Sequence, residues 1–403
     1  MNKLTLLLAI CLMCTPRAAS AQTSPESAGK SLLRMPIVFV DLADDPRYES
    51  VRAYGRVVLD AREHPFAGAQ VGVEDARAIG RAIGAEHHLA RITVKSPQEM
   101  AAAVLKEIDG GASFFLMDAP ADALRAVAAA VKGRDALLFN VSAPEDSLRR
   151  DLCSAEVVHT MPSRAQLMDG LTQFLVSRKW RDYLVLRGPR PGDVEMAAAF
   201  ERSAKKFGAR IVATRDFTPG TDPREREKNN VGLLSALNRD WDVTFVADAD
   251  FDFAREVSYR TVRPRPVVGS IDLEPTAWHW TWAHNGAPQL NTRFMRVTNG
   301  RHMGAADWAA WMAVKIISQS ALRTKSLDFK TRRSFILKDG YFDGDKGEPM
   351  SVRPWDHQLR QAVLLASPFS VVAAAPVEGF LHQRDVLDSL GDDESETPCR
   401  LNK

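Results

Sequence analysis

Short apolar runs alternate with helix-spaced stripes along most of the chain. In the first half, apolar runs at residues 36–40, 90–94, 113–117 and 136–139 predict buried strands. Between them, apolar residues recur at the spacing of one helix face. Such repeated strand–helix units predict a parallel sheet that is covered by helices on both faces.

The second half repeats this pattern. Apolar runs at residues 183–186, 210–214, 243–247 and 267–269 predict four further strands, again separated by helical stretches. A chain of 403 residues is too long for one ordinary core. The pattern therefore predicts an α/β protein with two doubly wound parallel-sheet lobes, which are joined by a hinge of several strands.

Two segments interrupt the alternation and mark crossings between lobes. Residues 160–164 lead into a helix, where Ser163 and Gln166 have the spacing of a capping box. Residues 272–286 contain Pro275, three tryptophans and Gly286, and we expect them to return the chain to the first lobe.

Two other stretches carry weaker signals. Residues 41–72 are charged and unpatterned, with a helix expected around residues 50–59, and a thin, alanine-rich stripe predicts a helix over residues 73–87. Residues 350–376 are strand-rich and predict a hairpin. Because ligands sit beyond the carboxyl ends of parallel strands, we expect the loop at 41–72 to form part of a cleft wall.

The N-terminus has the features of a secretory signal. Lys3 precedes an apolar stretch at residues 4–13, and small residues at 19–21 suit cleavage before Gln22. The apolar stretch is too short to span a membrane. Neither Cys11 nor Cys14 follows a small residue, so a lipid anchor is disfavoured. The sequence therefore predicts export to the periplasm.

Charge and cysteine content narrow the functional classes. The formal charge of +2 falls to zero once Lys3 and Arg17 leave with the signal, which disfavours nucleic acid as a partner. Cleavage also removes two of the four cysteines and leaves Cys153 and Cys399. In an oxidising compartment this pair predicts a disulfide.

No motif for catalysis or metal binding is present in the sequence. There is no nucleophile elbow, phosphate loop, HExxH or CxxC pattern. Residues 248–252 imitate the start of a calcium loop, but Phe253 replaces the glycine of the tight turn and Tyr259 the bidentate glutamate. We therefore expect no enzyme, no metal and no cofactor.

Polar residues at predicted strand ends are candidates for ligand binding. Asp41 and Asp118 follow first-lobe strands, and Arg187 and Asp248 follow second-lobe strands, so all four belong to the expected cleft. A guanidinium at Arg187 would suit an anionic ligand.

Two tryptophans in the second crossing are further candidates. Trp278 and Trp280 alternate with other residues, as does Trp282, and could form an aromatic wall for a planar or apolar ligand. The other interpretation is a strand with one buried face, because alternation places the three on the same side.

Residues 137–143, 159–163 and 166–175 together resemble type 1 periplasmic binding proteins of the branched-chain amino-acid kind. The resemblance implies that Ser142, with the neighbouring Asn140 and Ala143, holds a ligand carboxylate in the loop after a strand. Oriented N–H groups and a hydroxyl suit this role, although a plain turn serine is the alternative. The acidic loop at residues 41–45 lacks the family's glycine, which argues against an ordinary α-amino acid.

Four further segments, residues 152–164, 275–280, 353–361 and 378–384, are similar to one subfamily. It comprises ABC-transporter substrate-binding proteins that are associated with pyrroloquinoline-quinone-dependent alcohol dehydrogenase systems. The resemblance implies a small organic ligand, anionic and amino-acid-like or aromatic, and an inner-membrane ABC permease as partner. The alternative is an accessory or sensor protein that serves a periplasmic quinoprotein dehydrogenase without transport.

The resulting division of the chain has five parts. They are a signal peptide (1–21), a leader (22–35), a first lobe (36–161 and 285–345), a second lobe (162–284 and 346–376) and a C-terminal tail (377–403).

Overall fold

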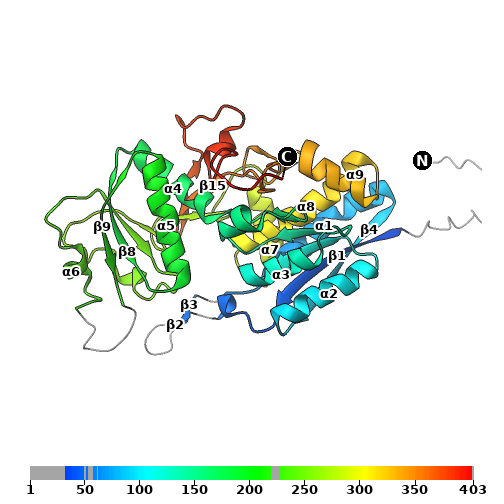
Figure 1. Ribbon diagram of the computed structural model, residues 1–403, viewed down its shortest axis with the longest axis horizontal. Helices are drawn as coiled ribbons and strands as arrows, with labels where there is room; N and C mark the ends of the chain where they lie inside the picture. The colour runs from blue at the N-terminus through cyan, green and yellow to red at the C-terminus, as the bar shows by residue number, and fades with distance from the viewer. Residues whose placement is uncertain (1–31, 50, 53–57, 61, 219–226, 402–403) are drawn as a thin grey trace, which may run out of the picture.

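The computed structural model describes residues 32–49, 51–52, 58–60, 62–218 and 227–401. The predicted signal peptide and most of the predicted leader lie outside these residues. Two α/β lobes stand side by side, and several chain segments run between them (Figure 1). No helix within the described residues has the length and apolar character needed to cross a membrane.

The first lobe is built on a five-stranded parallel sheet in the order β4-β1-β5-β6-β7. The strands are β1 (Leu33–Leu42), β4 (Ala85–Val94), β5 (Phe114–Asp118), β6 (Leu137–Asn140) and β7 (Val157–His159). The helices are α1 (Phe66–Ile83), α2 (Pro97–Asp109), α3 (Ala121–Ala130), α7 (Ala287–Val297), α8 (Ala305–Thr324) and α9 (Phe329–Ser334).

Alternate residues of β1 face two separate cores, as a doubly wound sheet requires. Ile37 and Phe39 pack in a core with α1, α7 and α8. Val38 and Val40 pack on the other face with α2 and α3.

The second lobe has a four-stranded parallel sheet in the order β11-β10-β8-β9. Its strands are β8 (Asp182–Arg187), β9 (Arg210–Asp216), β10 (Val243–Ala247) and β11 (Val267–Gly269). Its helices are α4 (Arg164–Ser177), α5 (Pro191–Lys206) and α6 (Val231–Ser235). The prediction of two parallel-sheet lobes is therefore confirmed.

Small sheets and single turns complete the molecule. An antiparallel sheet joins β12 (Glu274–Thr276), β15 (Val363–Ser367) and β16 (Ser370–Ala375). Two-stranded pairs are β2 (Val51–Arg52) with β3 (Val58–Asp60), and β13 (Phe342–Asp343) with β14 (Pro349–Met350). Single turns are η1 (Pro46–Tyr48), η2 (Leu148–Leu152), η4 (Ala254–Glu256), η5 (Phe335–Asp339) and η6 (Val386–Ser389).

Three segments connect the lobes, at residues 160–163, 277–286 and 351–362. At the first, Ser163 and Gln166 form the predicted capping box at the start of α4. The third runs beside β7, where the backbone N–H of Leu359 donates to His159 O at 2.9 Å. Residues Met350, Val352 and Leu359 pack in the first-lobe core, whereas Val363 and Leu365 pack in the second. The predicted lobe boundary at residue 346 stays a prediction.

Two predicted elements differ from the structure. The helix expected over residues 73–87 is α1, which begins at Phe66 and ends before β4. The apolar stripe of α1 is thin because α1 packs on α8 through glycine. A Cβ atom at Gly68 would lie 2.0 Å from Asp307 O. The helix expected around residues 50–59 is wrong where the chain is described, because β2 and β3 pair there.

Candidate functional site

A cavity of ≈ 660 Å³ lies between the lobes, at the ends of strands β6 and β10. Both lobes line it, as expected for a cleft beyond the carboxyl ends of parallel strands. The first lobe contributes Arg47, Tyr48, Arg62, Glu63, Ser142, Pro144, Met161, Arg301, His302 and residues 304–307. The second lobe contributes Arg164, Leu167, Met168, Met196, Asp248, Ala249, Phe251, Gly269, Ser270, Glu274 and Pro275.

Asp118 holds the first-lobe side of this cavity together. It is fully buried at the end of β5 and accepts hydrogen bonds from Tyr48 Oη at 2.6 Å and Arg47 Nη2 at 3.2 Å, with His64 Nδ1 at 2.6 Å. Burial alone would raise the pKa of Asp118, but the bond from His64 and the charge of Arg47 outweigh it and lower the pKa. Asp118 therefore lies behind the cavity and fixes two residues that line it.

Asp41 lies beside Asp118 in the register of the sheet and is equally buried. Its carboxylate accepts from Arg91 Nη2 at 2.5 Å, and His64 Nδ1 is 3.6 Å away. Within the described part of the chain, Asp41, His64 and Asp118 form a group that could hold a metal ion. Because Arg47 and Arg91 already pair with these carboxylates, the arrangement favours an ion-pair network over a bound cation.

The loop after β6 brings Ser142 to the cavity. Asn140 is buried and its side chain accepts from the N–H of Ala143 at 2.9 Å, which folds the loop back on itself. Ser142 Oγ accepts from Arg47 Nη1 at 3.0 Å and lies in the cavity wall. Asn140 and Ala143 therefore support the loop from behind, and Ser142 presents the hydroxyl.

On the second-lobe side, Asp248 reaches the cavity and Arg187 does not. Asp248 accepts from the N–H groups of Phe253 and Ala254 at 3.0 and 2.9 Å, and burial raises the pKa of its carboxyl. Arg187 instead pairs with Asp216 at 2.7 Å on the neighbouring strand and is absent from the cavity wall. A strand-end position alone did not decide which way its side chain turns.

The predicted aromatic wall is replaced by a different apolar surface. Trp278 is buried in the first-lobe core, where its indole N–H donates to Asn291 at 3.0 Å and its ring stacks on Trp308. Trp280 stacks on His302, with ring centroids 4.1 Å apart. Their segment forms turns in place of a strand, so alternation does not align the rings. Of the two, neither is in the cavity wall, although His302 is.

Three methionines and two other large apolar side chains lie in the cavity wall. Met161, Met168 and Met196 come from three different segments and are joined by Leu167 and Phe251. Methionine is flexible and polarisable, so such a surface adapts to ligands of different shape.

Several arginines in the cavity wall were not singled out from the sequence. Arg301 pairs with Asp307 in the first turn of α8 at 2.7 Å, and Arg164 pairs with Glu145 and Glu195 at 3.3 and 2.9 Å. Arg47 lies in the unpatterned loop at residues 41–72. That loop was expected to form a cleft wall, but nothing in its pattern indicated which residue would face inward.

The two lobes touch across the mouth of the cavity. Arg62 Nη2 donates to Ala249 O of the opposite lobe at 2.7 Å, and its guanidinium lies over the Phe251 ring at 5.6 Å from the centroid. Arg62 of the first lobe thus links directly to the second lobe beside the cavity.

Comparison with known proteins agrees with this architecture. The family model described as periplasmic binding protein matches residues 67–225. No curated protein matches the chain. A branched-chain amino acid ABC transporter periplasmic ligand-binding protein from Burkholderia xenovorans superposes with a TM-score of 0.70 at 14% identity, over 92% of this chain and 100% of that one.

Two further solved structures are similar. The R. palustris ABC transporter solute-binding protein in complex with benzoate gives a TM-score of 0.62 at 11% identity, over 90% of this chain and 99% of that one. The closed leucine-, isoleucine-, valine-, threonine- and alanine-binding protein from Brucella ovis gives 0.64 at 15% identity, over 90% and 98%. The chain therefore has the type 1 periplasmic binding protein fold, and its residues 67–225 match the periplasmic binding protein family.

Proposed function

We propose that the protein is the periplasmic substrate-binding component of an ABC-type uptake system. One observation carries the proposal: a cavity of ≈ 660 Å³ is lined by both lobes, which also touch across its mouth through Arg62 and Ala249. A ligand that contacts both lobes favours the closed arrangement over an open one. An inner-membrane permease is the proposed partner, and the predicted signal peptide supports a periplasmic location.

The cavity wall supports a small organic anion with an apolar or aromatic body as the ligand. Ser142, Arg47 and Arg301 offer a hydroxyl and guanidinium groups for a carboxylate, and the methionines with Phe251 offer an apolar surface. Similar proteins are described with leucine or with benzoate. An aromatic or quinone-like acid suits this surface better than a sugar, which needs more amide and carboxylate partners.

The ligand-binding roles of individual residues are part of this proposal. Ser142 and Asp248 are proposed to contact the ligand, since both are in the cavity wall. Asp41, Asp118 and Asn140 are proposed to support the residues that do.

We also propose that the protein is associated with pyrroloquinoline-quinone-dependent alcohol dehydrogenase systems. This proposal rests on the resemblance of four sequence segments. An aromatic or quinone-like acid would suit such a setting, with the protein acting either in uptake or as an accessory of the dehydrogenase. Co-purification with a dehydrogenase and without a small ligand would favour the accessory role.

Calorimetric titration tests the proposal. Panels of aromatic acids, quinone carboxylates, branched-chain amino acids and sugars are titrated into the wild type, Ser142→Ala and a control, Ser370→Ala, at the exposed start of β16. Loss of a hydrogen bond to a charged ligand group should weaken binding about ten- to a hundredfold in Ser142→Ala. The control should bind as the wild type does. Equal affinity of all three proteins for a confirmed ligand would overturn this placement of the site.

A further inference from the structure

The C-terminal tail, residues 377–401, lies against α4 on the side away from the cavity. Arg164, Leu167 and Met168 of this helix line the cavity, whereas Asp169 and Gln173 contact the tail. Figure 1 shows the tail, in red, at the upper edge of the boundary between the lobes, and β2 and β3 at the lower edge. Arg62, which closes the mouth, follows β3. The tail and the β2–β3 pair, which Arg62 follows in the sequence, therefore lie at opposite edges of the boundary.

The first part of the tail is bound to the second lobe. The N–H of Gly391 donates to Asp169 at 2.8 Å, and Lys206 Nζ of α5 donates to Gly391 O at 2.7 Å. Gln173 Nε2 donates to Ser389 Oγ at 3.1 Å. Leu390 is buried in the second-lobe core.

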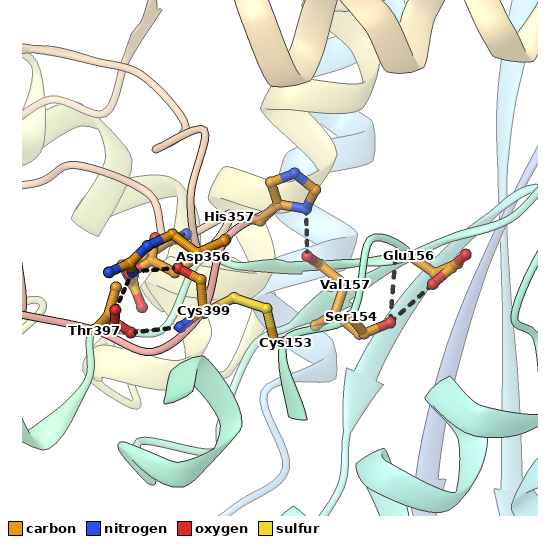
Figure 2. Close-up of a disulfide and its surroundings, with 10 residues drawn as sticks. Cys153, Ser154, Glu156, Val157, Asp356, His357, Thr397 and Cys399 are labelled. Atoms are coloured by element: carbon orange, nitrogen blue, oxygen red, sulfur yellow. Dashed lines mark hydrogen bonds between the residues drawn. A yellow bond between two sulfur atoms is a disulfide. The ribbon is translucent and has the colours of Figure 1, made fainter. Parts of the chain in front are cut away.

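The last part of the tail is bound to the first lobe. The predicted disulfide is present between Cys399 and Cys153, which follows η2 and precedes β7 (Figure 2). Arg150, which lies in η2 and precedes Cys153, pairs through Nη1 with Asp392 of the tail at 3.1 Å. The tail is thus a fourth connection between the lobes, and its attachment to the first lobe is covalent.

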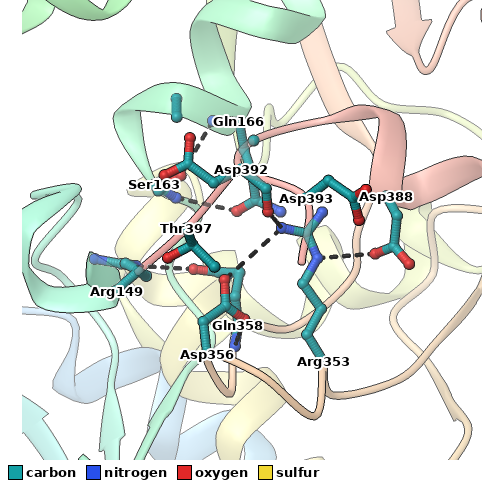
Figure 3. Close-up of polar contacts among 12 residues, drawn as sticks. Arg149, Ser163, Gln166, Arg353, Asp356, Gln358, Asp388, Asp392, Asp393 and Thr397 are labelled. Atoms are coloured by element: carbon teal, nitrogen blue, oxygen red, sulfur yellow. Dashed lines mark hydrogen bonds and ion pairs between the residues drawn. The ribbon is translucent and has the colours of Figure 1, made fainter. Parts of the chain in front are cut away.

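A buried ion pair and buried hydrogen bonds hold the tail against the third connecting segment. Arg353 and Asp388 have side chains that are 1% and 0% exposed, and Arg353 Nε donates to Asp388 at 2.9 Å (Figure 3). Arg353 Nη2 also donates to Leu390 O at 2.5 Å. In the same region Arg149 donates to Gln358 at 2.9 Å, and burial lowers the pKa of Arg149 to about 10. Moving the tail would leave buried charges without partners, which is costly.

This position has a mechanical consequence for hinge motion. A rotation that opens the mouth moves the lobes toward each other on the side beyond the hinge. The tail and its buried ion pairs already fill that side, and close-packed groups resist compression. We infer that the C-terminal tail is a stop that limits how far the two lobes open, and that the Cys153–Cys399 disulfide holds this stop in place.

Lobe separation in the ligand-free protein tests the inference, so the result does not depend on the proposed function. Nitroxide labels are carried by keto amino acids in place of Asp122 and Tyr259, which are exposed on the first and second lobe. Distance distributions are measured by pulsed electron paramagnetic resonance. The proteins are the wild-type background, Cys153→Ser/Cys399→Ser, and that double variant with Lys206→Ala or with the control Lys205→Ala at the exposed neighbouring position.

If the tail limits opening, the distances between the labels should increase stepwise from variant to variant. The double cysteine variant should gain a population at longer distance, and Lys206→Ala should enlarge it because the second-lobe attachment is also weakened. Lys205→Ala should add nothing. As a second approach that needs no substitution of the tail, a dithiol reductant should shift the wild type and leave the double variant unchanged. Superimposable distributions in all folded variants and in the reduced wild type would overturn the inference.

Discussion

The boundary between the lobes is built differently on its two sides. On the tail side, a disulfide joins the C-terminal tail to the first lobe, and the buried pair of Arg353 and Asp388 joins the tail to the third connecting segment. On the mouth side, the contact from Arg62 to Ala249 is exposed to solvent. Breaking a buried ion pair costs about 3–5 kcal/mol, whereas an exposed charged contact contributes at most about 1 kcal/mol. This difference supports opening on the mouth side rather than on the tail side.

The largest effect is expected where the tail meets the third connecting segment. Arg353→Met should lower the free energy of unfolding by about 3–5 kcal/mol, because Asp388 keeps its charge in a buried site with one partner fewer. Urea denaturation measures the change. The control Arg384→Met removes an exposed arginine of the tail, which pairs with Glu394, and should change stability by less than about 1 kcal/mol. Equal effects of the two substitutions would contradict the difference between a buried and an exposed contact.

Removing the disulfide should have an effect of similar size. Cys153→Ser/Cys399→Ser removes a cross-link between residues that are 246 positions apart in the sequence. The free energy of unfolding should fall by roughly 2–5 kcal/mol. Urea denaturation of oxidised wild type and of the variant gives this number. Thiol titration of unfolded, unreduced mature protein should find no free thiol. Two free thiols per chain would show that the tail is not fastened as described.

The free energy of unfolding should depend on pH through His357, which lies in the third connecting segment. This residue is buried, and burial lowers its pKa to about 4. The unfolded chain binds a proton near pH 6.5 and the folded protein does not, so the contribution of His357 is complete above pH 6.5 and is lost as the pH falls toward 4. The loss reaches about 3 kcal/mol.

Comparison with His357→Gln isolates this contribution, since all other titrating groups are common to both proteins. The free energy of unfolding of wild type minus that of the variant should fall as the pH falls from 6.5 to 4. A constant difference for His357→Gln would contradict a neutral, buried imidazole.

The smallest effect on stability is expected at the mouth. Arg62→Ala should change the free energy of unfolding by less than about 1 kcal/mol, because its contact with Ala249 is exposed. It should nevertheless shift the distance between the lobes in the ligand-free protein, since a contact across the mouth is lost. Arg260→Ala, which removes an exposed second-lobe arginine, should alter neither quantity. A loss above 2 kcal/mol in Arg62→Ala would remove the distinction between the two sides.

The sequence predicted the lobes because buried parallel strands leave strong apolar runs and caps leave local signals. Ser163 and Gln166 show this for α4, whose start the structure places where the capping box predicts it. The predicted start of α1, at residue 73, is later than the observed start at Phe66. The reason is that Gly68 and Gly72 make the contact of α1 with α8, and glycine contributes no apolar signal. Close backbone approach is a tertiary property that periodicity does not record.

The candidate site was harder to predict than the fold. The resemblance to binding proteins indicated Ser142 and a strand-end position indicated Asp248, and both residues are in the cavity wall. Trp278 is a residue type that often lines ligand sites, but here its indole N–H donates to Asn291 inside the core. Arg47 lies in a loop without pattern, and its direction is set by Asp45 and Asp118. Side-chain direction depends on partners that are distant in sequence.

Mass spectrometry of the protein purified from its own periplasm tests the central claim, that a small molecule binds between the lobes and closes the mouth. Under native conditions the account predicts a population with one bound organic acid per chain, which denaturation releases, and less of it in Ser142→Ala than in Ser370→Ala. Adding the released compound to stripped protein should shorten the distance between labels at positions 122 and 259. Protein without any bound molecule, and with label distances that no compound of the panels changes, would contradict the account.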